Sequence, residues 1–352
     1  MNYDIVLATR NRRSVLNVSI PLMLSQSRQP TNFILVDSSD DHQSIARSVR
    51  EIFSAFRGQT VLKLIESKPG TAVQRNVGLN YVESEIVMFP DDDALWYPGY
   101  AESIMSIYEM DREQLIGGVP GDQANTPPPT ASIQASLPYS MTLRDRINLL
   151  FSKPLRRLEL LPFMRETAFL EGDNKIRGKP VPKWLEEKNA QLVGPMTGFT
   201  MSFRKSSIVV HKFDENLGRY ALFEDYDASL QVMETKIIVK AKGAKVFHYK
   251  SPEKRTNGFE WGTIMILNRA YIICKAAPPG SSARRYLIPY SVYKCIRYLA
   301  QCQSSYGRQR FKGAFYALRH VRGLLSSPPE GLVAAFLGAR EECLKHAKKG
   351  TA

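Results

Sequence analysis

The sequence predicts an α/β protein with a Rossmann-like mixed sheet flanked by helices and a basic helical extension at its C-terminal end. Over the first 95 residues, short apolar segments rich in β-branched residues alternate with amphipathic segments of helical period. Continuous apolar segments of this length are typical of strands buried on both faces. Their alternation with helices favours parallel β-α-β units with right-handed crossovers. A chain of 352 residues is long enough for one large unit or for two subdomains.

The expected strands of this first region share a continuous apolar run, and they cover residues 4–8, 33–37, 61–65 and 86–89. The first helix between them is expected to be capped by Ser14 and to be interrupted or kinked by Pro21. The second helix, over residues 43–56, repeats its apolar side chains at helical spacing. The third covers residues 71–82, with Thr71 as a candidate cap.

Polar residues stand at or just after the end of each of these four strands. They are residues 9–12 (TRNR), 37–40 (DSSD), 67–70 (SKPG) and 91–93 (DDD). Sheets of this kind bind their ligands at the C-terminal ends of the strands. We therefore expect the four polar segments to converge on one binding site.

The region after the fourth strand is less regular. The proline-rich residues 125–132 predict an exposed loop. Two mixed basic and apolar segments, residues 140–151 and 155–164, predict short helices. A regular pattern then returns with an alternating strand, a helix that starts with acidic residues and a last strand, expected at residues 194–206, 223–236 and 244–252.

The net charge of +14 belongs almost entirely to the last third of the chain. Residues 1–248 contain 30 Lys and Arg against 29 Asp and Glu, whereas residues 249–352 contain 18 against 5. A local excess of this size predicts an anionic partner, which could be a membrane surface or a nucleic acid.

The basic third of the chain is expected to be helical. Its three helical segments cover residues 258–276, 283–301 and 308–325. The third segment carries an apolar stripe made of Phe311, Ala314, Phe315, Leu318, Val321 and Leu325, and its basic flanks are Arg308, Arg310, Lys312 and Arg319. Basic flanks beside an apolar stripe are typical of helices that lie in a membrane interface. The alternative is a helical subdomain with a solvated basic face.

Several observations favour a cytoplasmic protein that docks on the inner face of the cell membrane. The longest apolar run, residues 263–277, is broken by Asn268 and Arg269 and falls short of the ~18–20 apolar residues of a membrane span. Residues 1–10 lack the basic start and apolar run of a signal peptide. The four cysteines form no Cys-x-x-Cys pair, which argues against a zinc site.

Three adjacent aspartates, Asp91, Asp92 and Asp93, follow the fourth strand. Like charges this close repel one another unless a cation lies beside them. Mg²⁺ and Mn²⁺ take carboxylate oxygens and keep positions open for phosphates. Side chains of a strand alternate, so Asp91 and Asp93 should point one way and Asp92 the other. A solvated acidic turn is the alternative, but the position after a buried strand favours a functional site.

The motifs taken together resemble those of the nucleotide-sugar-dependent inverting glycosyltransferases of family 2, of the bacterial polysaccharide type. The matching segments run in family order over residues 3–252: IVLATRNR, ILVDSSD, KPGTAVQRNVGL, IVMFPDDDALWYPG, GPMTGFTMSFRKS, FDENLGRYALFEDYDASLQV and AKVFHYKSP. Arg10 departs from the pattern, since an aromatic residue is commoner there. The resemblance implies a GT-A catalytic domain over residues 1–252, with a nucleotide-binding half (1–95) and a metal and acceptor half (96–252), followed by a basic helical tail (253–352).

The resemblance also implies roles for individual residues. Asp93 and His248 would hold Mn²⁺ or Mg²⁺, which neutralises the departing diphosphate. The other donor-side residues are Asp91 for the ribose, Asp92 for a sugar hydroxyl, Asp37 for the base, Thr9 and Arg12 around the nucleotide, and Arg75 for the diphosphate or Asp91. A surface ion pair is the alternative for Arg75, and a structural histidine is the alternative for His248.

On the acceptor side, the resemblance makes Asp225 the general base and gives Glu224 a positioning role. The alternative is that both acids merely satisfy a helix N-terminus. The expected partners are a UDP- or dTDP-sugar, a glycan or lipid-linked acceptor and an anionic membrane, with nucleic acid disfavoured. Two other functions are the alternatives. One is a sugar nucleotidyltransferase, but the segment TRNRRSV lacks the glycines of a loop that binds a triphosphate. The other is a non-enzymatic basic protein that binds membrane or RNA.

Overall fold

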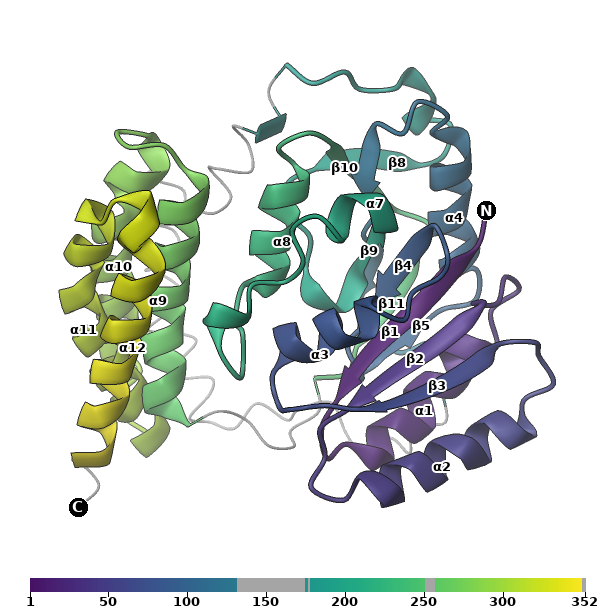
Figure 1. Cartoon of the computed structure of the whole chain (residues 1–352), viewed down its shortest axis with the longest axis horizontal. Coiled ribbons are helices and arrows are strands. Elements are labelled where there is room, and N and C mark those ends of the chain that lie inside the picture. Colours follow the sequence, from purple (N-terminus) through teal and green to yellow (C-terminus); the bar gives the residue numbers. More distant parts are fainter. Residues whose placement is uncertain (132–174, 177, 251–256, 350–352) are drawn as a thin grey trace. The chain divides into compact units, whose positions relative to one another are not determined.

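The computed structural model describes residues 1–131, 175–176, 178–250 and 257–349 (Figure 1). Within these residues the chain forms two compact units, the first from residues 1–131 and 175–250 and the second from residues 257–349. The predicted domain limit at residue 252 and the short helices expected at 140–151 and 155–164 lie outside the described residues.

The first unit is built on an eight-stranded mixed sheet with the strand order β3-β2-β1-β4-β9-β6-β10-β8. Its strands are β1 (Tyr3–Thr9), β2 (Asn32–Asp37), β3 (Val61–Glu66), β4 (Ile86–Phe89), β6 (Ile116–Gly118), β8 (Ala190–Val193), β9 (Met201–Arg204) and β10 (Ile237–Ala241). Strands β1 to β4 are mutually parallel, whereas β9 is antiparallel to β4. The predicted β-α-β arrangement and the mixed sheet flanked by helices are therefore confirmed. β3 is an edge strand with partly exposed side chains, so the expectation that all four strands are buried on both faces is wrong for β3.

Alternate side chains of β1 and β2 reach two different layers. Ile5 and Phe33 join the core that packs against α1 (Arg13–Leu24), α2 (His42–Ala55) and α4 (Tyr100–Met110). Val6 and Val36 face the other way, toward Gly78 of α3 (Thr71–Leu79). A Cβ at Gly78 would lie only 2.3 Å from Val6 Cγ1, so this glycine allows α3 to approach the sheet closely. The close approach holds α3 at the end of β1, beside the polar loops.

Two predicted helix starts are wrong. The N-cap positions of α1 and α3 are Arg12 and Gly70, so Ser14 and Thr71 lie inside the first turns of these helices rather than at their N-caps. Pro21 also fails to end α1, which continues to Leu24. The helix face around Ile20 and Met23 is fully buried, and this packing outweighs the hydrogen bond that proline cannot donate.

A separate three-stranded sheet joins β5 (Ala94–Trp96), β11 (Lys245–His248) and β7 (Asp122–Ala124). The antiparallel pairing of β11 with β5 sets His248 opposite Ala94. The last strand, predicted over residues 244–252, is therefore present, and its register brings a histidine next to the aspartates that precede β5.

The remaining elements of the first unit are short. They are the helical turns η3 (Lys183–Leu185), η4 (Gly198–Thr200) and η5 (Glu215–Leu217), and the helices α7 (Lys205–Ile208) and α8 (Glu224–Val232). Only residues 201–204 of the strand predicted at 194–206 are extended, because η4 interrupts its first half. Residues 125–131 contain neither helix nor strand and are mostly exposed, as predicted for this part of the proline-rich loop.

The second unit consists of the helices α9 (Gly258–Ala276), α10 (Ser282–Leu299), α11 (Ser305–Ser326) and α12 (Leu332–Lys349), with the turn η6 (Pro329–Gly331) (Figure 1). Glycines allow α9 and α11 to pack backbone against backbone, since a Cβ at Gly262 would lie 2.0 Å from the Arg310 carbonyl oxygen. The predicted helical character of the C-terminal region is confirmed. Among the described helices, none is both long enough and apolar enough to cross a membrane.

Part of the predicted α11 stripe is used inside this unit. Ala314 and Val321 are buried, and Phe311, Leu318 and Leu325 are partly covered. Arg310, expected to flank the stripe on the surface, lies 4.4 Å from the centre of the Tyr298 ring and donates to Gln301. The expectation of a stripe that is free along its whole length is therefore wrong, because the same face packs against neighbouring helices.

Candidate functional site

The three aspartates lie at the carboxyl edge of the parallel strands. β4 ends at Phe89, and Asp91 forms an isolated parallel bridge with Ala8 near the end of β1. The chain then turns into β5. The acids are thus fixed by backbone pairing on both sides, between the ends of two central strands.

Asp92 points toward the loop after β1. Thr9 Oγ1 donates a hydrogen bond of 2.8 Å and Arg12 Nη1 one of 2.7 Å to its two carboxylate oxygens. Burial raises the pKa of Asp92 to about 6, although Arg12 and Thr9 act in the opposite direction. The predicted convergence of residues 9–12 with residues 91–93 is therefore confirmed, whereas the role of Thr9 and Arg12 around the nucleotide stays a prediction.

Asp91 and Asp93 meet His248. The predicted strand alternation does not apply here, because Asp92 and Asp93 lie in a turn and Arg12 Nη1 contacts both Asp92 (2.7 Å) and Asp93 (3.5 Å). Each of the three residues offers one ligand atom, and these atoms lie within 4.8 Å of one another. His248 Nε2 is 3.2 Å from Asp93 Oδ1, and its ring stacks on Phe199 at 4.4 Å between centroids. Two carboxylates and an imidazole held this close fit a divalent ion such as Mn²⁺. Asp91 joins the cluster although the sequence assigned it to the ribose.

Arg75 links this cluster to the start of α8. It is buried, donates to Asp91 at 2.8 Å through Nη2, and donates to Glu224 through Nη1. Of the alternatives considered for Arg75, the pairing with Asp91 is confirmed and the surface ion pair is wrong. The Arg75 guanidinium thus holds Asp91, a candidate metal ligand, and Glu224 of α8 in fixed positions relative to each other.

Glu224 and Asp225 begin α8 after a tight turn. Phe223 adopts a left-handed conformation, with φ of 75°, which is uncommon for a bulky residue and marks an over-determined local structure. Asp225 accepts hydrogen bonds from the backbone N–H groups of Gly198 (2.8 Å) and Tyr226 (2.9 Å). Burial raises the pKa of Asp225 and of Glu224 above the ordinary carboxyl range, while Arg75 lowers both.

Gly198 lies where these groups meet. A Cβ built on it would be 3.6 Å from Asp225 Oδ2, 3.8 Å from Arg75 Nη2 and 3.9 Å from Asp91 Oδ1. Asp225, Arg75 and Asp91 therefore lie close together around Gly198. A carboxylate with a raised pKa beside the candidate metal ligands Asp91, Asp93 and His248 can deprotonate one reactant while a cation neutralises negative charge on another.

Asp37 is enclosed by its own loop. It is fully buried, accepts from Ser39 N and Ser39 Oγ through one oxygen, and lies 2.7 Å from His42 Nδ1 through the other. A base could reach this carboxylate only if one of these contacts opened, and its predicted role stays a prediction. His42 and Ser39, which contact this carboxylate, are themselves partly exposed.

Most of the sequence-predicted residues lie together. Thr9, Arg12, Arg75, Asp91, Asp92, Asp93, Glu224, Asp225 and His248 form one connected set of contacts. Gly198 and Phe199 were missed. Their segment was recognised only as strand-like, and nothing in its residue pattern indicates that one backbone N–H holds Asp225 or that one ring supports His248.

Comparisons with known proteins agree with this geometry. Residues 4–170 match the family model described as glycosyl transferase family 2. No curated protein sequence matches the chain. The predicted resemblance to family 2 is therefore confirmed by the family model.

Solved structures with a similar fold were also found. One is the mannosyltransferase PcManGT from Pyrobaculum calidifontis in complex with GDP-Man and Mn²⁺, with a TM-score of 0.51 and 15% identity over 97% of this chain and 87% of that chain. Another is S. aureus TarS residues 1–349 with UDP-GlcNAc, with a TM-score of 0.51 and 12% identity over 99% and 92%. GalNAc-T7 with UDP, GalNAc and Mn²⁺ has a TM-score of 0.53 and 11% identity over 89% of this chain and 54% of that chain. At these identities, the likeness shows a shared fold, and the predicted GT-A architecture is confirmed.

Proposed function

We propose that this chain, which carries a family 2 glycosyltransferase fold, moves a sugar from a nucleoside-diphosphate sugar to a hydroxyl of a glycan or lipid-linked acceptor with inversion. The observation that supports the proposal is the proximity of Asp225, through Gly198 and Arg75, to the cluster of Asp91, Asp93 and His248. This arrangement suits a reaction in which one reactant loses a proton while another releases an anionic group.

The proton-accepting step is assigned to Asp225. The acceptor oxygen attacks the anomeric carbon, the bond from that carbon to the diphosphate oxygen breaks, and the hydroxyl proton passes to the Asp225 carboxylate. The backbone N–H groups of Gly198 and Tyr226 hold this carboxylate in place. Direct attack by the acceptor inverts the anomeric centre and needs no enzyme nucleophile.

The arginines position the remaining groups. Arg75 holds Glu224 and Asp91 in fixed orientations, so Glu224 can align the acceptor while Asp91 faces the donor. Arg12 fixes Asp92 and lies 3.5 Å from Asp93. Mn²⁺ or Mg²⁺ held by Asp93, His248 and Asp91 would supply the positive charge that stabilises the departing diphosphate.

The donor proposal is a UDP- or dTDP-sugar. The similar folds described above bind GDP-Man, UDP-GlcNAc or UDP, which supports a nucleotide sugar without selecting its base. We also propose that the enzyme works in the cytoplasm at the inner face of an anionic membrane. Residues 249–352 contain 18 basic and only 5 acidic residues, and basic residues are attracted to anionic lipid headgroups. A lipid-linked precursor of a surface polysaccharide would be presented there.

A thermal-shift screen tests the proposal. Nucleotides and nucleotide sugars are added with Mn²⁺, with Mg²⁺ or with excess chelator. A ligand at 100 times its Kd stabilises the folded state by about 2.7 kcal/mol. The nucleotide sugars that share the correct base should therefore raise the Tm by several degrees. The rise should depend on metal. If no nucleotide sugar raises the Tm in either metal, the proposal is wrong.

A further inference from the structure

Helix α10 has an exposed apolar ridge. Pro289, Val292, Ile296 and Leu299 are all exposed, and they follow one another at spacings of three and four residues along one side of the helix. Ile296 and Leu299 are 51% and 54% exposed. Four exposed apolar residues in one row form a patch rather than scattered single side chains. We call these four residues the α10 ridge.

The opposite side of α10 is also apolar, but it is buried. Leu287, Tyr290 and Tyr293 are almost fully covered, and Arg269 of α9 lies 4.7 Å from the centre of the Tyr290 ring. A helix that is apolar on both sides is usually covered on both sides. Packing among the described helices of the second unit therefore accounts for one face of α10, and within the described residues it does not account for the ridge.

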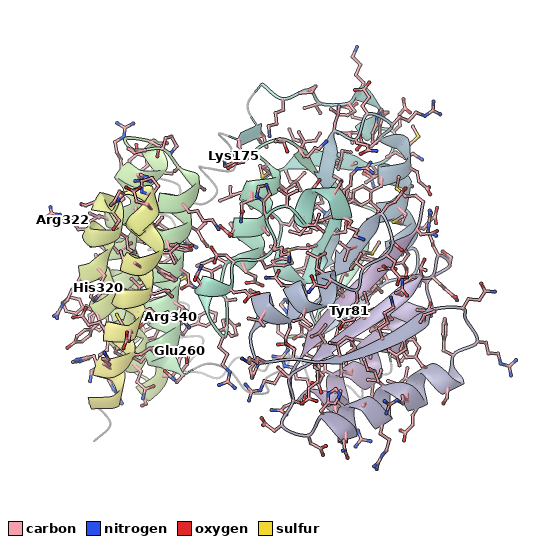
Figure 2. All side chains as sticks on the ribbon, in the orientation of Figure 1. Tyr81, Lys175, Glu260, His320, Arg322 and Arg340 are labelled. Atoms are coloured by element: carbon pink, nitrogen blue, oxygen red, sulfur yellow. The ribbon has the colours of Figure 1, made fainter. Side chains whose placement is uncertain are left out.

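The charge beside the ridge has one sign. Residues 261–329, which include all of α10 and α11, contain eleven Lys and Arg and no Asp or Glu. On α11, which packs against α10, the same spacing exposes a second row made of Arg308, Lys312, Phe315, Arg319 and Arg322. Figure 2 shows Arg322 projecting outward from the helices. We call these five residues the α11 basic row.

We infer that the α10 ridge is the surface that enters an anionic lipid bilayer, with the α11 basic row at the phosphate headgroups. This inference rests on the proposed function, which includes an anionic membrane as partner, and it specifies the surface that meets the membrane. The sequence predicted an apolar stripe on α11 for this contact, whereas the inferred contact lies on α10. Exposed aliphatic side chains on one helix and a row of cations on the helix that packs against it match the composition of an interfacial surface. Each cation near such a surface gains attraction within a Debye length of about 8 Å.

Charge argues against two other occupants. A second copy of the chain that met this one through the same face would bring two purely basic rows together, which is unfavourable. A nucleic acid would use the cations but would leave Val292, Ile296 and Leu299 against a charged, hydrated backbone. An anionic bilayer can bury the aliphatic side chains of the α10 ridge and attract the cations of the α11 basic row at the same time.

Helix α12 provides a matched control. Val333, Leu337 and Leu344 are exposed to a similar degree, at 38%, 41% and 36%. The exposed Glu341 lies on the same side, four residues after Leu337, and pairs with the exposed Lys345 at 2.7 Å. This pair gives the α12 face no excess of cations, so α12 offers a comparable apolar content without the charge complementarity.

The experiment is co-sedimentation of the whole chain with vesicles of phosphatidylcholine alone or mixed with phosphatidylglycerol, at low and high salt. We expect binding only to the mixed vesicles. The triple change Val292→Ser, Ile296→Ser and Leu299→Ser should weaken binding at least about tenfold at both salt concentrations, from the lost apolar burial. Val333→Ser, Leu337→Ser and Leu344→Ser should leave binding unchanged. Changing Arg308, Lys312, Arg319 and Arg322 to Gln should remove most of the salt-sensitive part.

The outcomes separate the inference from its rivals and from the proposed function. If the intact chain ignores mixed vesicles at low salt, or if the α10 and α12 triple variants lose binding equally, the inference is overturned. It is also overturned if light scattering shows a dimer that the α10 triple variant converts to a monomer. Each variant must keep the wild-type Tm and its rate of donor hydrolysis in solution. If a variant loses vesicle binding but keeps its rate of donor hydrolysis, the proposed sugar transfer is unaffected. If the wild-type chain shows no donor hydrolysis, the result contradicts the proposed sugar transfer but not the membrane surface.

Discussion

Arginine side chains are used differently in the two units. In the first unit, Arg12 contacts Asp92 and Asp93, and the buried Arg75 contacts Asp91 and Glu224. In the second unit, α10 and α11 contain no acidic residue at all, and all four cations of the α11 basic row are exposed. The first arrangement fixes the positions of acids, and the second gives a surface one sign of charge.

The difference predicts two kinds of behaviour. A buried arginine between carboxylates is costly to remove, because the partner charges are left without compensation. An exposed arginine contributes little to folding and acts on a charged partner through a field that salt screens. Catalysis should therefore depend on the first unit and be insensitive to salt, whereas membrane association should depend on the second and weaken with salt.

The largest effect is expected at the metal cluster. Asp93→Asn keeps the shape of the side chain but removes a charged ligand, so it should abolish transfer and the metal-dependent part of nucleoside-diphosphate binding. Titration calorimetry with and without Mn²⁺ measures the binding, and circular dichroism checks the fold. Full activity of the folded variant would remove Asp93 from the site.

The next effect is expected at the general base. Asp225→Asn should lower the transfer rate by about 10²–10⁴-fold, the usual contribution of a general base. Donor affinity should barely change, because the base acts on the acceptor. If donor affinity falls as far as the rate, Asp225 belongs to the nucleotide side of the site and the assignment is wrong.

The comparison itself is tested by changing one arginine in each unit. Arg75→Met should destabilise the fold by about 3–5 kcal/mol, because it leaves Glu224 and Asp91 without their buried partner. Arg308→Gln should change stability by less than about 0.5 kcal/mol. Arg75→Lys, which keeps the charge but loses the two-pronged guanidinium, should fall between them. Urea unfolding measures all three, and equal losses at both positions would contradict the distinction.

A smaller effect is expected in the pH dependence of the rate. Asp225 must be ionised to accept a proton, and burial raises its pKa. The rate should therefore fall as pH decreases, with a midpoint above the ordinary aspartate value of about 3.9. The midpoint belongs to the coupled acids rather than to one residue. A rate that stays constant down to pH ~4 would contradict a buried base with a raised pKa.

Sequence patterns predicted the parallel strands and the acidic segments well, because both depend on short local signals. The apolar runs at 4–8 and 33–37 correspond to β1 and β2, and Asp91 and Asp93 meet His248, although the aspartates lie in a turn rather than in the expected alternating strand. Pro21 shows where local signals fail, since the burial of α1 outweighs a poor helix residue.

The parts that were missed depend on contacts between distant residues. Gly198 reaches Asp225 across 27 positions in the chain, and Arg75 reaches Glu224 across 149. The α10 ridge was missed for a related reason. Both sides of α10 are apolar in sequence, so only the packing of the helices decides which side stays exposed.

The most direct test of the central claim is the release of nucleoside diphosphate from a nucleotide sugar, measured in Mn²⁺, then in excess chelator, then after Mn²⁺ is restored. The account predicts release in the first and third conditions and almost none in the second, with Asp93→Asn inactive throughout. Undiminished release in chelator would contradict a metal held by Asp93 and His248. Absence of release from every nucleotide sugar in the presence of metal would contradict sugar transfer itself.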